Sequence, residues 1–143
     1  MSDLKGLKRL TANAQRVLAL GEEVAKNNNA KEYKAIHLFY AILSDKSLII
    51  GDLFAKLGID YEETKMRVND ELLKYSSETG VGKASVSEEL KKVINDSIVI
   101  ARELGTVYVG IEHLFLSIFK QTNLEFVQSI NEAGINYVVV KVL

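Results

Sequence analysis

Apolar positions recur every three or four residues along most of the chain, which is the period of an amphipathic α-helix. The first such stripe follows Thr11, whose hydroxyl suits a helix N-cap. Apolar segments at 36–43 and 48–58 predict two further helices, and Gly58 is placed to take the left-handed conformation that closes a helix. Asp60 precedes a fourth helix, with acidic residues in the first turn, where they complement the helix dipole. The first stripe consists of Ala14, Val17, Leu18, Gly21 and Ala25.

A stretch rich in serine and glycine, YSSETGVGKASV at residues 75–86, interrupts this pattern and predicts a surface loop or linker. Ser87 then resembles Thr11 as an N-cap, and two glutamates occupy the first turn of the helix that it begins. The following apolar residues repeat the first stripe; they are Leu90, Val93, Ile94 and Ala101.

The two halves of the chain align without a gap at a constant shift of 76 residues (113 − 37). Under this shift His37-Leu38-Phe39 meets His113-Leu114-Phe115, and Gly58-Ile59 meets Gly134-Ile135. Such a series predicts an all-α fold of two four-helix repeats, packed about a pseudo-twofold axis into one compact domain. We expect a single domain over residues 1–143, with repeat one at about 10–75, a linker at 76–86 and repeat two at about 87–143.

The C-terminal YVVVKVL is the exception to the helical pattern. Its β-branched valines favour a strand, whereas the duplication places the last helix of repeat two there. We give the duplication more weight and expect a short or frayed helix.

Composition narrows the possible functions. The chain has 143 residues, enough to bury a core without a metal or disulfide, and no cysteine, which excludes disulfides and thiolate chemistry. Eighteen basic against nineteen acidic residues leave a net charge of −1, which argues against binding to nucleic acid or anionic membranes. The chain lacks the ~20 consecutive apolar residues of a membrane span, so we expect a cytoplasmic protein. We also expect the isolated domain to be a monomer.

Three motifs suggest chemistry, and each fails on inspection. TGVGKAS at 79–85 resembles a phosphate-binding loop, but Ser77 stands where that loop needs glycine and Ala84 where it needs Ser or Thr. The Glu112-His113 pair resembles zinc metalloprotease helices, but Ser117 replaces the second histidine. No serine or threonine has the partners of a catalytic triad. We therefore expect no cofactor, no metal and no catalysis.

The histidines have a structural interpretation instead. His37 and His113 each lie near the start of the second helix of their repeat, where a partly buried ring can bond a nearby backbone group.

The doubled pattern of a Thr or Ser cap, an alanine-containing helix and then G-x-E-H-L-x-L-x-I resembles the N-terminal domain of Clp-type AAA+ unfoldases, the double Clp repeat. The best match is VSEELKKVINDSIVIARELGTVYVGIEHLFLSIF at 86–119, with Ile111 where the family usually has threonine. The first repeat keeps LTANAQRVLAL and HLFYAIL.

This resemblance implies a non-catalytic helical module in front of two ATPase rings, with adaptor proteins and protein substrates as partners. In the ClpC-like branch it also implies binding of phosphorylated arginine. There the hydroxyl residue that opens each repeat meets the phosphate, and the glutamate before the histidine meets the guanidinium.

Transferred to this sequence, the resemblance predicts a phosphoarginine site at Ser87 and Glu112, with Lys91 adding positive charge. In the first repeat Thr11 is kept, but Ile36 replaces the glutamate, so that site is expected to be lost. Glu112 also has a simpler interpretation, as a first-turn acid that complements the helix dipole.

Three other functions remain open from the sequence. The first is a free-standing accessory protein of the same fold that docks onto Clp machinery. The second is a small helical metal-dependent enzyme that uses Glu112 and His113. The third, a nucleic-acid binder, is the least favoured because no basic face is apparent.

Overall fold

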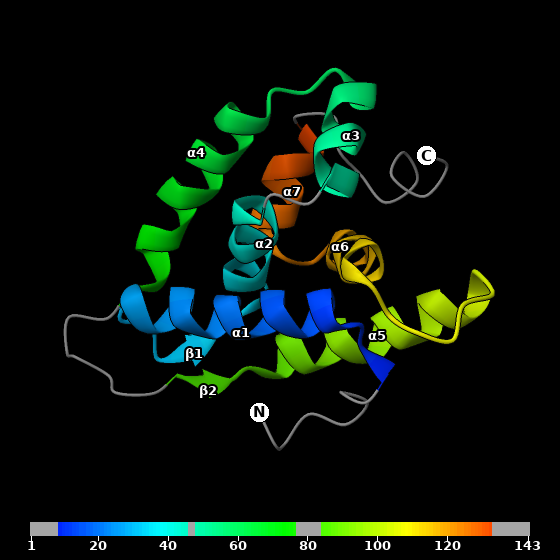
Figure 1. Cartoon of the computed structure of the whole chain (residues 1–143). Helices are drawn as coiled ribbons and strands as arrows, with labels where there is room; N and C mark the ends of the chain where they lie inside the picture. Colours follow the sequence, from blue (N-terminus) through cyan, green and yellow to red (C-terminus); the bar gives the residue numbers. More distant parts are fainter. Residues whose placement is uncertain (1–8, 46–47, 77–83, 133–143) are drawn as a thin grey trace.

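The computed structural model describes residues 9–45, 48–76 and 84–132, and most of them are helical (Figure 1). The predicted all-α class is confirmed. Most of the TGVGKAS motif and the whole of YVVVKVL lie outside the described residues. The helices are α1 (Ala12–Asn27), α2 (Ala35–Ser44), α3 (Leu48–Leu57), α4 (Tyr61–Leu72), the 3-10 turn η2 (Leu73–Tyr75), α5 (Glu88–Glu103), α6 (Ile111–Lys120) and α7 (Glu125–Glu132).

The helix caps that the sequence predicts lie at helix ends. Asp60 caps α4 by accepting a hydrogen bond from the Glu63 N–H at 3.1 Å, and Gly58 before it has a φ of +66°. No helix within the described part of the chain is long and apolar enough to cross a membrane. The buried residues of α1 are the predicted stripe of Ala14, Val17, Leu18, Gly21 and Ala25.

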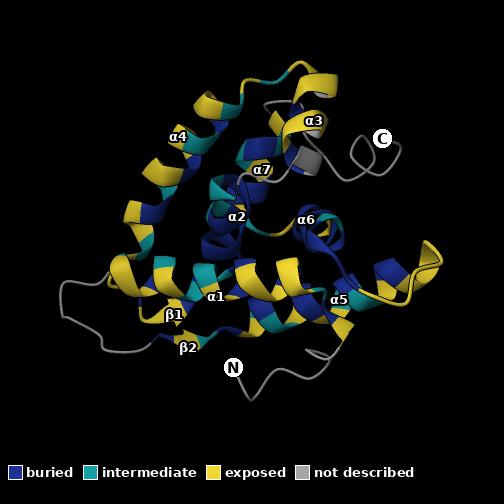
Figure 2. Ribbon diagram, viewed as in Figure 1, coloured by how far each residue is buried: buried dark blue, intermediate teal, exposed yellow. Residues whose placement is uncertain are grey.

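The core lies where α2 and α6 meet, at the centre of the molecule (Figures 1 and 2). Phe39 of α2 stacks on Phe115 of α6 with ring centroids 5.8 Å apart and planes at 27°. These two residues are counterparts under the 76-residue shift, and a residue that contacts its own counterpart lies beside the symmetry axis. Phe119 and Phe126 extend this aromatic cluster.

Two short parallel β interactions join the repeats, and the sequence did not predict them. Strand β1 (Glu32–Tyr33) pairs with strand β2 (Ser85–Val86), so the stretch predicted as a linker ends in a strand. An isolated bridge joins Leu10 and Val109. Leu10 is the counterpart of Val86, and Val109 is the counterpart of Tyr33. The two pairings are therefore equivalent contacts: in each, the segment before the first helix of one repeat pairs with the loop after the first helix of the other. The exact boundaries of the repeats remain a prediction.

Candidate functional site

The two hydroxyl residues predicted to bind phosphate are both helix caps. Thr11 Oγ1 accepts from the Ala14 N–H at 3.1 Å, and Ser87 Oγ accepts from the Leu90 N–H at the same distance. Ser87 is only 4% exposed. Each hydroxyl therefore already has a backbone partner, and Ser87 has little surface to offer a ligand.

The histidines have the structural role expected from the sequence. Nδ1 of His37 accepts from the Lys34 N–H at 2.9 Å, and Nδ1 of His113 accepts from the Gly110 N–H at 2.9 Å. Both rings are buried. An Nδ1 that accepts a hydrogen bond leaves the ring proton on Nε2. Burial, helped by the charge of Lys34, lowers the pKa of His37 to about 4.

The Glu112-His113 pair is not arranged as a metal site. Glu112 Oε1 lies 3.5 Å from Nδ1 of His113, a nitrogen whose lone pair already accepts the Gly110 N–H. Across residues 9–45, 48–76 and 84–132, no group of three or more His, Cys, Asp or Glu side chains could hold a metal ion.

Ser87 and the segment before Glu112 have different hydrogen-bond partners, and the site predicted from these two residues stays a prediction. Ser87 caps the start of α5 and Glu112 lies in the first turn of α6, with the 16 residues of α5 between them in the chain. The Ser87 N–H instead donates to the Tyr33 carbonyl at 3.1 Å, beside the start of α2. We call this meeting of Ser87 with residues 33–36 the first corner.

Glu112 lies near the hydroxyl residue of the other repeat. The Thr11 N–H donates to the Val109 carbonyl at 2.9 Å, and the Val109 N–H donates to the Arg9 carbonyl at 2.8 Å. The Glu112 side chain folds back over Gly110 and remains 43% exposed. We call this meeting of Thr11 with residues 109–112 the second corner. Each corner thus combines the cap of one repeat with the helix start of the other.

The two corners differ in how the helix N-terminus is satisfied. In the first corner, Glu89 Oε1 accepts from the Ala35 N–H at 3.1 Å. The counterpart of Glu89 is the neutral Asn13, whose side chain accepts from Arg16 at 3.4 Å. The counterpart donor, the Ile111 N–H, has no acceptor among the residues that the structure describes. The first corner therefore has its helix N–H bonded by a carboxylate from the other repeat, whereas at the second corner the carboxylate over the helix start is that of Glu112 itself.

Lys91 lies in the first turn of α5, after the Ser87 cap. Its Nζ lies 3.4 Å from Glu88 Oε1, one turn away on α5. The positive charge predicted to serve a phosphate at Ser87 thus lies near a carboxylate of its own helix.

Sequence reasoning missed an exposed apolar loop beside the second corner. Leu104, Val107 and Tyr108 are 47%, 78% and 62% exposed. The equivalent loop of repeat one has a closely similar helix ending, since both C-caps have φ of −86° and the next residue has positive φ. The signal was present in the alignment, because the counterparts of the three apolar residues are polar; they are Asn28, Lys31 and Glu32.

Comparison with known proteins identifies the fold. The family model of the Clp repeat (R) N-terminal domain matches residues 9–133. The chain is 29% identical over 115 residues to the chaperone protein ClpB of Rhodopirellula baltica, covering 80% of the chain and 13% of that protein. It is 30% identical over 109 residues to ClpB of Rickettsia felis, covering 75% of the chain and 13% of that protein. The chain therefore spans about 13% of the length of these relatives.

Solved structures support the same assignment at the level of the fold. The Hsp104 N-terminal domain from Candida albicans superimposes with a TM-score of 0.80 at 19% identity, covering 93% of the chain and 87% of that structure. A ClpV N-domain in complex with a VipB peptide gives a TM-score of 0.75 at 16% identity, covering 94% and 83%. The duplicated helices, the paired corners and the family match lead to one conclusion: the chain belongs to the Clp repeat N-terminal domain family.

Proposed function

We propose that this domain binds adaptor and substrate proteins for a Clp-type ATPase and catalyses no reaction itself. In this proposal the ATPase rings, and the unfolding and degradation that they drive, are supplied by the rest of a longer cytoplasmic protein, and the isolated domain is a monomer. Family membership supports this proposal, as does the ClpV N-domain that was solved with a peptide.

The second corner is the observation that carries the proposal. The Glu112 carboxylate is 43% exposed, and no lysine or arginine of the described residues pairs with it. The exposed Val107 and Tyr108 precede it in the chain by only a few residues. A partner side chain that combines a cation with an apolar stem suits this combination, because the charge meets the carboxylate while the stem covers apolar surface.

The finer proposal is that this partner side chain is phosphoarginine, bound at Thr11 and Glu112. The Glu112 carboxylate would accept the guanidinium, and the N-terminus of α6, with its free Ile111 N–H, would accept the phosphate. This arrangement moves the site away from Ser87 and Lys91. The first corner would not bind, since Ile36 offers no carboxylate there and Glu89 already occupies the helix N–H.

Isothermal titration with free phosphoarginine tests the finer proposal. Glu112→Gln should weaken binding roughly tenfold or more, because it removes a charge-assisted contact. Glu88→Gln is the matched control, since Glu88 is also a first-turn acid but belongs to the first corner and is 93% exposed. Absence of heat with the unaltered domain, or binding unchanged by Glu112→Gln, would remove phosphoarginine from the proposal.

Binding of an unfolded model protein tests the broader function. Fluorescence anisotropy with labelled, reduced and carboxymethylated α-lactalbumin should show binding that Val107→Ser and Tyr108→Ser weaken. Met66→Ser is the control, because Met66 is 68% exposed on α4, outside the second corner. Equal weakening by all three substitutions would indicate non-specific adhesion and contradict the proposed site.

The structure bears on one of the two alternative functions and not on the other. The metal-dependent enzyme is disfavoured by the His113 nitrogen that already accepts a backbone hydrogen bond. The free-standing accessory protein has the same fold and would use the same corners. The downstream reading frame distinguishes it from an unfoldase, since Walker motifs there would exclude it.

A further inference from the structure

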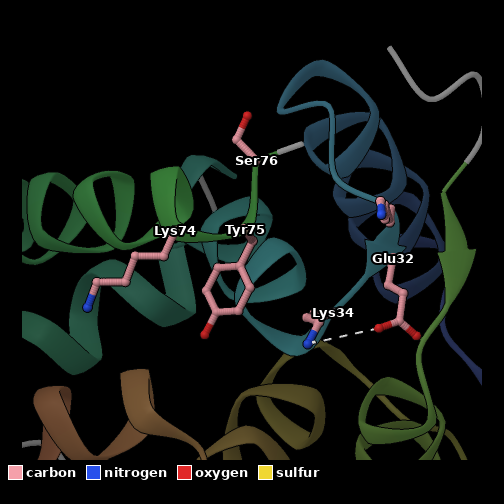
Figure 3. Close-up of a pocket in the computed structure, with 6 residues that line it drawn as sticks. Glu32, Lys34, Lys74, Tyr75 and Ser76 are labelled. Carbon is pink, nitrogen blue, oxygen red and sulfur yellow. Dashed lines mark ion pairs between the residues drawn. The ribbon is translucent and has the colours of Figure 1, made fainter. Parts of the chain in front are cut away.

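A second surface, separate from the second corner, has the features of a ligand site. A pocket of about 270 Å³ lies between β1, the start of α2 and the end of η2. Lys34 and Glu32 lie on one side of it, and Lys74, Tyr75 and Ser76 lie on the other (Figure 3). Lys31 completes the lining. We call these six residues the basic pocket.

The three lysines of this pocket differ in how closely carboxylates approach them. Lys74 is 3.1 Å from Glu71 and 3.4 Å from Glu125, so carboxylates outside the lining balance it. Lys34 Nζ has a distant carboxylate neighbour, Glu32 Oε1 at 3.9 Å, and lies 5.3 Å from the centre of the Tyr75 ring. Lys31 has no ion-pair partner in the part of the chain that the structure describes. Lys31 and Lys34 are therefore the two of the three lysines without a close ion pair, in surroundings that also hold the carboxylates of Glu32, Glu71 and Glu125.

The fold does not require these lysines. Under the 76-residue shift Lys31 corresponds to Val107 and Lys34 to Gly110, in a loop that makes the same hydrogen bonds in both repeats. Lys34 is also poorly suited to its position, because it is the N-cap of α2 and makes no side-chain cap. Glycine is a better N-cap, and a cation at a helix N-terminus opposes the dipole. A residue that destabilises its own helix indicates a role outside folding.

The helix start beside the pocket already holds one carboxylate. Glu89 reaches across from α5 and accepts from the Ala35 N–H at 3.1 Å. This internal contact shows that a carboxylate fits at this end of α2. It also means that a second anion must be held by the lysine ammonium groups and the hydroxyls of Tyr75 and Ser76, not by the helix N–H.

We propose that the basic pocket binds an anionic side chain, a carboxylate or a phosphate monoester, on an acidic segment of a partner protein. The inference rests on the proposed protein-binding function and adds a second contact of opposite charge preference. The pocket is below the roughly 300–1,000 Å³ usual for small-molecule sites, so it suits a single side chain and not a nucleotide. The domain would then contact cationic side chains at the second corner and anionic ones at the basic pocket.

Fluorescence anisotropy with three short labelled peptides of one design tests this inference: one rich in glutamate, one with glutamine in the same positions, and one with phosphoserine. The glutamate or the phosphoserine peptide should bind and the glutamine peptide should not. The Lys31→Gln/Lys34→Gln double variant should weaken that binding roughly tenfold or more. A glutamate response identifies a carboxylate as the ligand, and a response to phosphoserine alone identifies a phosphate.

Two controls distinguish binding at the basic pocket from non-specific electrostatic attraction and from binding at the second corner. Lys56→Gln/Lys120→Gln removes the same charge from exposed positions on α3 and α6 and should leave binding unchanged. Phosphoarginine binding by the Lys31→Gln/Lys34→Gln variant should equal that of the unaltered domain, so that failure here is distinguishable from failure of the proposed function. Equal binding of the glutamine peptide, no binding of either anionic peptide, or equal loss in both lysine double variants would overturn the proposal.

Discussion

Gly21 in the middle of α1 lies against the buried ring of Tyr33. A Cβ built at Gly21 would stand 2.8 Å from Tyr33 Cζ and 2.9 Å from Cε1, and its nearest neighbour would be the hydroxyl oxygen. Tyr33 cannot easily move aside, because its hydroxyl donates to the Leu18 carbonyl at 2.7 Å in the core. We therefore predict that Gly21→Ala destabilises the domain.

The magnitude follows from two opposing contributions. Alanine favours a helix interior over glycine by about 1 kcal/mol, while overpacking a fixed core site costs about 1–3 kcal/mol. The net loss for Gly21→Ala is therefore roughly 1 kcal/mol, or a fall in Tm of about 3 °C for a domain of this size. Gly51 on α3 is the control, since it is exposed and nothing lies within 4 Å of its added Cβ. Gly51→Ala should gain about 0.5–1 kcal/mol.

Urea unfolding followed by circular dichroism measures both variants. The second repeat suggests a further test, because its counterpart pair is Ser97 and Val109, a larger residue facing a smaller one. Adding Tyr33→Val to Gly21→Ala should therefore cost about 1–2 kcal/mol less than the sum of the single substitutions. If Gly21→Ala stabilised the domain as much as Gly51→Ala does, the close packing inferred for Tyr33 would be refuted.

Three more predictions concern stability and its dependence on pH. Gly58→Ala should cost about 1–2 kcal/mol in urea unfolding, because φ is +66° there; no loss would contradict the left-handed turn. The pKa of His37 is about 4 in the folded protein and near 6.5 in an unfolded chain. The unfolded chain therefore binds the proton first, and the free energy of unfolding should fall by about 3 kcal/mol as the pH drops from 6.5 to 4. His37→Gln should abolish this fall, and an NMR titration midpoint above 6 would show that the ring is not shielded. Ser87→Ala should cost about 1 kcal/mol through loss of the bond from the Leu90 N–H, and Ser87→Asp, which preserves a cap, should recover most of it.

The sequence predicted most of the fold because the signals involved are local. The buried stripe of α1, the caps at Thr11 and Ser87 and the left-handed Gly58 each depend on residues within a few positions of one another. The duplication was equally visible, because an ungapped shift preserves the core positions; Phe39 and Phe115 show it by stacking on each other.

The arrangement of the corners could not be predicted in the same way. A strand of two residues such as β1 leaves no alternating pattern to detect. The pairing of Ser87 with Glu112 assumed that a site is built within one repeat, whereas the β interactions join the cap of one repeat to the loop of the other. The one available sign in the sequence was the apolar residue directly before each cap, Leu10 and Val86. An apolar residue there indicates that a segment distant in the sequence packs against it.

The crossed β interactions also bear on the ancestry of the domain. A protein with only one repeat could have formed both corners only as a homodimer. The two corners of that homodimer would have been identical. Fusion of the copies into a single polypeptide removed that constraint, since a substitution now changes one corner and leaves its twin intact. In this protein the lysine-lined pocket beside the first corner has no equivalent at the second corner, where Glu112 has no equivalent at the first.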